Sequence, residues 1–175
     1  MTDRTSTAQL GRGIRTPPRA VDTWEAAVPD AEYPIDVLLV EDDPGDELIT
    51  REAFDTHTLG NTLHVVRDGQ EALDFLYRRG AHTGAVRPDL ILLDLNLPKY
   101  DGRQVLERIK ADPELAAIPV VVLTTSSATE DVESSYRARA NAFVTKPVDL
   151  DAFMTAIQQI DGFFVRVVKL PRPHP

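Results

Sequence analysis

The sequence predicts an α/β fold, in which a doubly wound, five-stranded parallel sheet is covered by helices on both faces. Five short apolar runs alternate along the chain with segments whose apolar residues have helical spacing. Two of the runs, residues 90–93 and 120–123, are continuously apolar, as in strands that are buried on both faces. Each strand should therefore connect to the next through a right-handed helical crossover.

The first predicted strand is followed at once by acidic residues and by Pro44, which suits the first turn of a helix. Asp43, directly before it, suits the N-cap position. Later helices are preceded by the turn signals Asp68-Gly69 and Asp101-Gly102. The expected strands are residues 35–40, 62–66, 90–94, 120–123 and 142–145. The expected helices are residues 44–54 (or 44–57), 72–79, 103–111, 132–136 and 150–163.

One folded domain is expected over residues 35–163, because a chain of 175 residues is short for two domains. Residues 1–34 contain four prolines and show no helical or strand period, which predicts a disordered or extended leader. An alternative is that Trp24 and Val28 anchor a docking segment there.

Two further segments stand out. Residues 77–88 form a long, partly basic connection, and connections of this length in a compact domain are often functional. The C-terminal tail, residues 164–175, starts within the apolar run Phe163-Phe164-Val165, which either extends the core or contacts a second copy of the chain. We favour the dimer contact, because little of the core remains to be built there.

The composition excludes several classes of function. The formal net charge of −9 disfavours nonspecific binding to nucleic acid. The absence of cysteine excludes a disulfide framework, a thiolate metal site and a cysteine nucleophile. No apolar run reaches the roughly 18 residues needed to span a bilayer, and no secretory signal is visible. A cytoplasmic protein without nucleic-acid or membrane partners is therefore expected.

Five polar side chains follow the predicted strands, namely Glu41, Asp42, Asp94, Thr124 and Lys146. Ligands of open parallel sheets bind outside the carboxyl ends of the strands, so these groups would meet in one pocket if the strands are neighbours. Clustered carboxylates either take up protons or bind a cation, and such oxygen donors suit Mg²⁺. With Lys146 nearby, the cluster suggests phosphoryl transfer, in which Asp94 becomes an aspartyl phosphate. The alternative is that Asp94 only starts a turn and that the acids are solvated strand ends.

These motifs resemble the receiver domain of bacterial two-component response regulators, the CheY-like domains. The resemblance covers residues 35–163 and implies a flavodoxin-like sheet with the strand order 2-1-3-4-5. It also implies a protein that accepts a phosphoryl group from a histidine kinase. Such a protein catalyses only its own phosphorylation and dephosphorylation and is not an enzyme for other substrates. The matching segments are Val40-Glu41-Asp42, Asp94-Leu95-Asn96-Leu97-Pro98, Asp101-Gly102, Leu123-Thr124 and Thr145-Lys146-Pro147.

The resemblance assigns a role to each site residue. Asp94 is the expected phosphoacceptor, Thr124 the switch hydroxyl and Lys146 the contact to a phosphoryl oxygen. Phe143 stands at the place of the family's switch aromatic, with plain core packing as the alternative. The bond before Pro147 is expected to be cis, as in the family. The expected ligands of Mg²⁺ are Asp42 and Asp94 directly, Glu41 through water, and the backbone carbonyl of Asn96.

The sequence departs from the family pattern at three places. Glu41 replaces the commoner Asp, which can shift the metal slightly. Phe143 lacks a hydroxyl, so its switch depends on packing alone. Thr125 occupies a place often held by a small residue, which bears on solvent access and on the lifetime of the phosphate.

A narrower similarity is to regulators paired with phytochrome histidine kinases, which have no output domain and in some cases form homodimers. It rests on segments 74–80, 87–90 and 168–171. The chain is therefore predicted to be a single-domain regulator that signals through altered protein contacts. One alternative is a pseudo-receiver or adaptor that works without phosphate. Another is a phosphohydrolase, although Asn96 stands where the haloacid dehalogenase pattern needs a second Asp.

Overall fold

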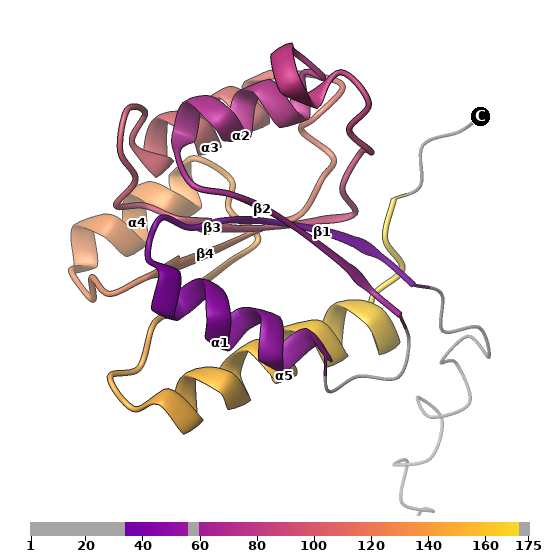
Figure 1. Ribbon diagram of the computed structural model, residues 1–175. Coiled ribbons are helices and arrows are strands. Elements are labelled where there is room, and N and C mark those ends of the chain that lie inside the picture. The colour runs from indigo at the N-terminus through magenta and orange to yellow at the C-terminus, as the bar shows by residue number, and fades with distance from the viewer. Residues whose placement is uncertain (1–33, 56–59, 172–175) are drawn as a thin grey trace, which may run out of the picture.

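The computed structural model describes residues 34–55 and 60–171, and these form a five-stranded parallel sheet with helices around it (Figure 1). The strand order is β2-β1-β3-β4-β5, which confirms the predicted fold class and strand order. Each strand lies within one residue of its predicted range. The strands are β1 (Asp36–Val40), β2 (Thr62–Val66), β3 (Leu90–Asp94), β4 (Val120–Thr124) and β5 (Ala142–Thr145).

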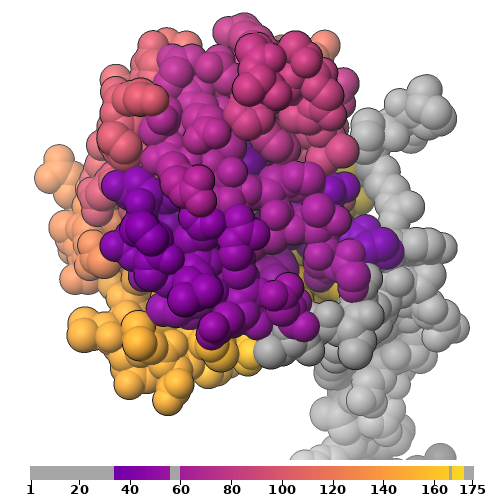
Figure 2. Space-filling model, in the orientation of Figure 1, coloured from indigo at the N-terminus to yellow at the C-terminus, as the bar shows by residue number. Residues whose placement is uncertain are grey.

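Helices cover both faces of the sheet. α1 and α5 lie together on one face, α2 and α3 lie on the other, and α4 lies next to β5 (Figure 1). In the space-filling view the side chains of α1 occupy the front of the molecule, above those of α5 (Figure 2). The helices are α1 (Pro44–Asp55), α2 (Gly69–Leu76), the short 3₁₀ helix η2 (Gly80–His82), α3 (Gly102–Ala111), α4 (Thr129–Arg137) and α5 (Leu150–Arg166).

Alternate side chains of the inner strands point to opposite faces and build two hydrophobic clusters. Leu38 and Leu93 belong to the cluster under α2 and α3, whereas Leu39 and Leu92 belong to the cluster under α1 and α5. All residues of β3 and β4 are buried, as expected for central strands covered on both faces. The carboxyl ends of these strands are therefore held on a tightly packed frame.

Aspartate side chains cap most of the described helices. The carboxylate of Asp43 accepts hydrogen bonds from the amides of Gly45 and Asp46, at 2.8 and 2.9 Å, which confirms it as the N-cap of α1. The N-caps of α2, α3 and α5 are Asp68, Asp101 and Asp149. These caps satisfy backbone donors at the helix starts and so fix where each helix leaves its loop.

α4 is the exception among the described α-helices. Its N-cap residue, Ala128, provides no side-chain hydrogen bond, and Ser135 is the residue of this helix that is buried. By contrast, α3 buries Gly102, Val105, Leu106 and Ile109. α4 is therefore attached to the domain through a much thinner layer of buried side chains.

Two helix ends differ from the predicted ones. α2 ends at Leu76 rather than near Arg79, because the backbone reverses at Arg78, whose φ is 53°. α5 continues to Arg166, three residues beyond the expected end at 163. Phe164 is buried in the cluster under α1 and α5, whereas Phe163 is 52% exposed. The ring of Phe164 therefore extends the core, and that of Phe163 does not.

The prediction of a cis peptide bond before Pro147 is wrong, because no peptide bond within residues 34–55 and 60–171 is cis. The trans form is also the intrinsically favoured one. The proposed leader, with its alternative docking role for Trp24 and Val28, lies almost wholly outside the described residues. None of the described helices has both the length and the apolar character required to cross a membrane.

Gly102, at the start of α3, offers a test of how tightly the loop after β3 is packed. A Cβ at this position would lie 2.1 Å from the carbonyl oxygen of Asp94 and 2.6 Å from Cα of Leu95. Both are backbone atoms, so Gly102→Ala must displace the loop, and we expect it to destabilise the fold by about 3 kcal/mol.

Chemical denaturation measures this loss. The matched control is Gly162→Ala in α5, where an added Cβ meets nothing within 4 Å. We expect the control to stabilise the fold by up to about 1 kcal/mol through helix propensity. Equal stabilities of Gly102→Ala and the parent protein would contradict the packing of this loop.

Candidate functional site

The ends of four neighbouring strands bring the predicted site residues together. Glu41 follows β1, Asp94 ends β3, Thr124 ends β4 and Lys146 follows β5. All four residues are buried. The backbone amide of Lys146 donates to the carbonyl of Thr124 at 2.8 Å, which continues the pairing of β4 and β5 past the last strand residue. Asp42, beside them, is exposed.

Lys146 is the centre of the cluster. Its Nζ donates to the carboxylates of Glu41 and Asp94 at 2.6 Å each, and to that of Asp46 at 2.8 Å. The Lys146 side chain is only 3% exposed. An unpaired charge at such a depth would be strongly unfavourable, so the ammonium and the carboxylates depend on each other.

Asp46 was not predicted as a site residue. Its position in the first turn of α1 has a structural explanation, because an acid there favours the positive end of the helix dipole. The signal that could have identified it is geometric: the first turn of α1 follows β1 directly and faces the same edge of the sheet. Its ion pair with Lys146 gives this carboxylate a second role.

The three carboxylates around Lys146 alter the protonation of the site. Burial raises the pKa of the Glu41 carboxyl from 4.5 to about 7, although its hydrogen bond and ion pair with Lys146 act in the opposite direction. Burial also lowers the pKa of the Lys146 ammonium, but the hydrogen bonds to Asp46, Asp94 and Glu41 outweigh this and raise it above its usual value. Lys146 therefore stays charged, while Glu41 takes up a proton near neutral pH when no cation is bound.

Three acids form a site of the kind that binds a divalent cation. Carboxylate oxygens of Glu41, Asp42 and Asp94 all lie within 4.8 Å of one another. Oxygen donors at this spacing suit a hard cation. The fold therefore brings together the three predicted carboxylates. Asn96 lies at its edge, where its backbone amide donates to Oδ1 of Asp94 at 2.9 Å.

The remaining predicted residues are arranged around this core. The hydroxyl of Thr124 accepts from the amide of Ser126 at 3.2 Å and from the side chain of Asn96 at 3.4 Å. Phe143 is partly buried on β5 and packs against the cluster under α2 and α3. Phe143 is therefore not one of the residues of the acidic cluster. Its contact with the core agrees with the alternative interpretation, in which this ring only packs in the core.

Comparison with known proteins places this geometry in a family. Residues 37–158 match the family model of the response regulator receiver domain. The response regulator Rcp1 of Synechocystis sp. is 45% identical over 135 residues, which cover 77% of this chain and 92% of that protein.

Two crystal structures are also similar. The Mn²⁺-bound form of Rcp1 has a TM-score of 0.77 at 45% identity, and the match covers 79% of this chain and 100% of that one. The phosphorylated cyanobacterial phytochrome response regulator RcpA has a TM-score of 0.78 at 42% identity, covering 79% and 99%. The chain is thus a response regulator: it belongs to the receiver-domain family, whose members are phosphoacceptors rather than enzymes for separate substrates, and it is similar over most of its length to Rcp1 and RcpA.

Proposed function

We propose that this response regulator accepts a phosphoryl group on Asp94 from a phosphohistidine of a histidine kinase of the phytochrome type. The observation that carries the proposal is the buried Lys146–Asp94 pair beside Glu41 and Asp42. A carboxylate next to one cation and to a second cation-binding position is arranged to receive a phosphoryl group. The similarity to a phytochrome response regulator supports the choice of kinase.

Both oxygens of Asp94 are oriented by this chain. Oδ1 accepts from the Asn96 amide at 2.9 Å and Oδ2 accepts from Nζ of Lys146 at 2.6 Å. In the transfer, one carboxylate oxygen forms a bond to phosphorus while the bond from phosphorus to the imidazole nitrogen breaks, and its electron pair leaves with the imidazole. Lys146 then balances part of the charge on the phosphoryl oxygens. Thr124, two hydrogen bonds from Asp94 through Asn96, is the proposed hydroxyl that responds.

The carboxylates of Glu41, Asp42 and Asp94, with the backbone carbonyl of Asn96, would hold Mg²⁺. When bound, this cation supplies neutralising charge for the phosphoryl oxygens. Mg²⁺ is proposed over other divalent cations because an all-oxygen donor set of carboxylates and a carbonyl is the kind it prefers. The relative crystallised with Mn²⁺ supports a divalent cation of this chemistry.

The charge gained on Asp94 is proposed to change the surface formed by α4, β5 and α5, with Thr124 and Phe143 as the moving side chains. α4 is the helix with the least buried attachment. Phe163 and Val167, on the last helix and just after it, are 52% and 55% exposed. We propose that these apolar side chains contact a second copy of the chain and that the output is an altered protein contact.

Phosphorylation at Asp94 is tested with phosphoramidate, a small phosphodonor, and Mg²⁺. We expect the intact mass to increase by one phosphoryl group, and Asp94→Asn to abolish the increase because an amide is not a nucleophile here. Asp43→Asn is the matched control, since Asn caps a helix as well as Asp and the Asp43 carboxylate accepts from the amides of Gly45 and Asp46. Equal labelling of the Asp94→Asn protein would exclude Asp94 as the acceptor.

The raised pKa of Glu41 predicts two opposite pH effects. The folded state holds the proton of Glu41 up to about pH 7, whereas the unfolded chain releases it near 4.5. Stability of the metal-free protein should therefore decrease as the pH rises from 4.5 and level off above about 7. Affinity for Mg²⁺ should instead increase as the pH rises through about 7, because binding needs the ionised carboxylate.

Denaturant unfolding and Mg²⁺ titration from pH 5 to about 8 measure both effects. Glu41→Gln should remove this part of the pH dependence of stability, because the amide does not titrate. Glu52→Gln, on the exposed face of α1, removes the same charge away from the site and should leave both profiles unchanged. Identical profiles for Glu41→Gln and the parent protein would assign the effect to another group.

The proposed homodimer is tested by light scattering with and without Mg²⁺ and beryllofluoride, a stable phosphoryl mimic. We expect twice the chain mass, and its loss in Phe163→Glu because a charge is placed on the apolar contact. Leu48→Glu is the control, since Leu48 is 57% exposed on α1. A mass that changes only with the mimic would mean that phosphorylation acts through assembly, and a monomer under both conditions would disprove the dimer.

A further inference from the structure

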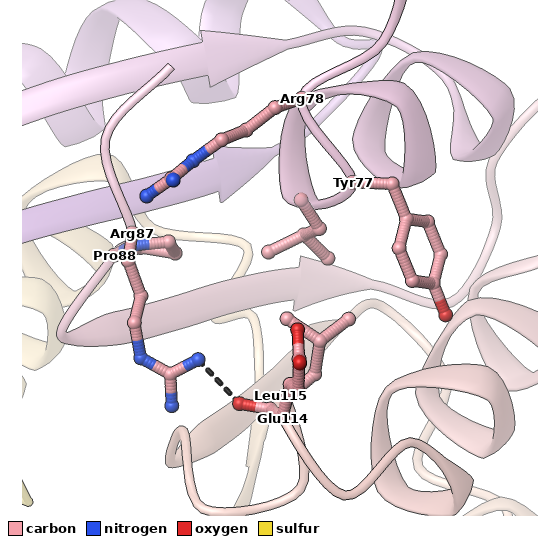
Figure 3. A pocket seen from close by; sticks show the side chains of 7 residues that line it. Tyr77, Arg78, Arg87, Pro88, Glu114 and Leu115 are labelled. Carbon is pink, nitrogen blue, oxygen red and sulfur yellow. Dashed lines mark hydrogen bonds between the residues drawn. The ribbon is translucent and has the colours of Figure 1, made fainter. Parts of the chain in front are cut away.

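A second pocket lies at the edge of the sheet opposite to Asp94, where the strands begin. It has a volume of about 220 Å³ and lies between the end of α2, the residues before β3 and the segment after α3 (Figure 3). Nothing in the proposed phosphoryl transfer uses it. The pocket is lined by Leu76, Tyr77, Arg78, Arg87, Pro88, Glu114 and Leu115.

Arg78 is held over this pocket by an unusual backbone conformation. Its φ of 53° lies in the left-handed region, and its amide donates to the carbonyl of Phe75 at 3.1 Å. Helices commonly end with glycine in this conformation, because an L side chain is disfavoured there. The arginine side chain extends from this turn across the pocket toward Arg87 (Figure 3). Among the described residues its guanidinium makes no ion pair or hydrogen bond.

Arg87 presents a second positive charge on the other side. Its guanidinium donates to the backbone carbonyl of Glu114, a neutral group that leaves the charge unbalanced (Figure 3). The neighbouring Arg79 behaves differently: its guanidinium stacks on the ring of Tyr77, 4.5 Å from the centroid, and Arg79 does not line the pocket. Two arginines therefore converge on one cavity in a chain whose net charge is −9.

The lining defines the ligand. Planar guanidinium groups suit carboxylate or phosphate oxygens. Leu76, Pro88 and Leu115 are buried and give the cavity apolar walls, which favours a ligand with hydrocarbon beside its charge. The carboxylate of Glu114 lines the same space, and it repels a doubly charged phosphate more than a singly charged carboxylate. We propose that this pocket binds a carboxylate next to an apolar side chain, in an acidic segment of a partner protein.

Binding here leaves the phosphoryl site accessible. The five residues of β3 separate the two ends of the sheet by about 16 Å. A partner held at the arginine pocket could therefore stay bound while a kinase reaches Asp94. The pocket also gives a function to the long, partly basic connection of residues 77–88.

The test uses the full chain and NMR, with the capped peptide acetyl-Gly-Glu-Leu-Gly-amide as the probe. We expect saturable shifts of the Arg78 and Arg87 side-chain Nε–H signals and of the Leu115 amide. The same peptide with Gln in place of Glu should cause none. Arg78→Gly should weaken binding about fivefold or more, because it removes one charged donor. Its melting temperature should be unchanged or higher, since glycine suits the left-handed backbone.

Two further variants separate a specific pocket from general charge attraction. Arg79→Gln removes the same charge one residue away and should change affinity less than about twofold. Glu114→Gln should strengthen binding about twofold, because it removes a repelling carboxylate. Equal losses in Arg78→Gly and Arg79→Gln, shifts that do not saturate, or saturable binding of inorganic phosphate without binding of the peptide would each overturn the proposal.

Discussion

One ammonium group balances the whole acidic edge of this sheet. Lys146 contacts carboxylates that follow β1, end β3 and begin α1, so a single Nζ binds groups that lie 52 to 105 residues away from it along the chain. Buried ion pairs contribute little net stability by themselves, but removal of one partner leaves charges that water cannot reach. The balance is incomplete, because three acids face one cation, and burial raises the pKa of Glu41 to about 7. The site is therefore arranged to accept further positive charge, which a divalent cation provides.

The caps and the tight turn at Gly102 explain why this edge is so well defined. Aspartate caps fix the starts of α1 and α3, and the backbone of Asp94 lies in direct contact with Gly102. The central strands β3 and β4 are buried throughout, so neither can slide without exposing apolar residues. Precise placement of Asp94 thus depends on backbone packing, whereas the protonation of its neighbours depends on Lys146.

The sequence predicted the strands and most of the acidic cluster, because buried parallel strands have a strong apolar signal and their carboxyl ends must converge. The strand order came from the resemblance to receiver domains. The sequence did not predict the contact between Asp46 and Lys146. An aspartate in the first turn of a helix can either stabilise the helix start or belong to a site, and the sequence alone does not separate these two roles. It placed the end of α2 too late, because the backbone of Arg78 adopts a conformation that sequence preference disfavours. It favoured a dimer contact over core packing for the run that contains Phe164, whereas this ring is buried in the cluster under α1 and α5. The contact of Asp46 and the burial of Phe164 depend on tertiary contacts that local patterns do not encode.

The weak attachment of α4 has a consequence for timing. Moving a helix that buries little apolar surface requires only a small activation free energy, so we expect α4 to exchange between positions on the microsecond-to-millisecond scale. Hydrolysis of an acyl phosphate is a covalent reaction with a much higher barrier. If Asp94 accepts the phosphoryl group as proposed, the conformation of α4 will follow the phosphorylation state without delay, and the duration of the signal will be set by hydrolysis at Asp94 rather than by the fold.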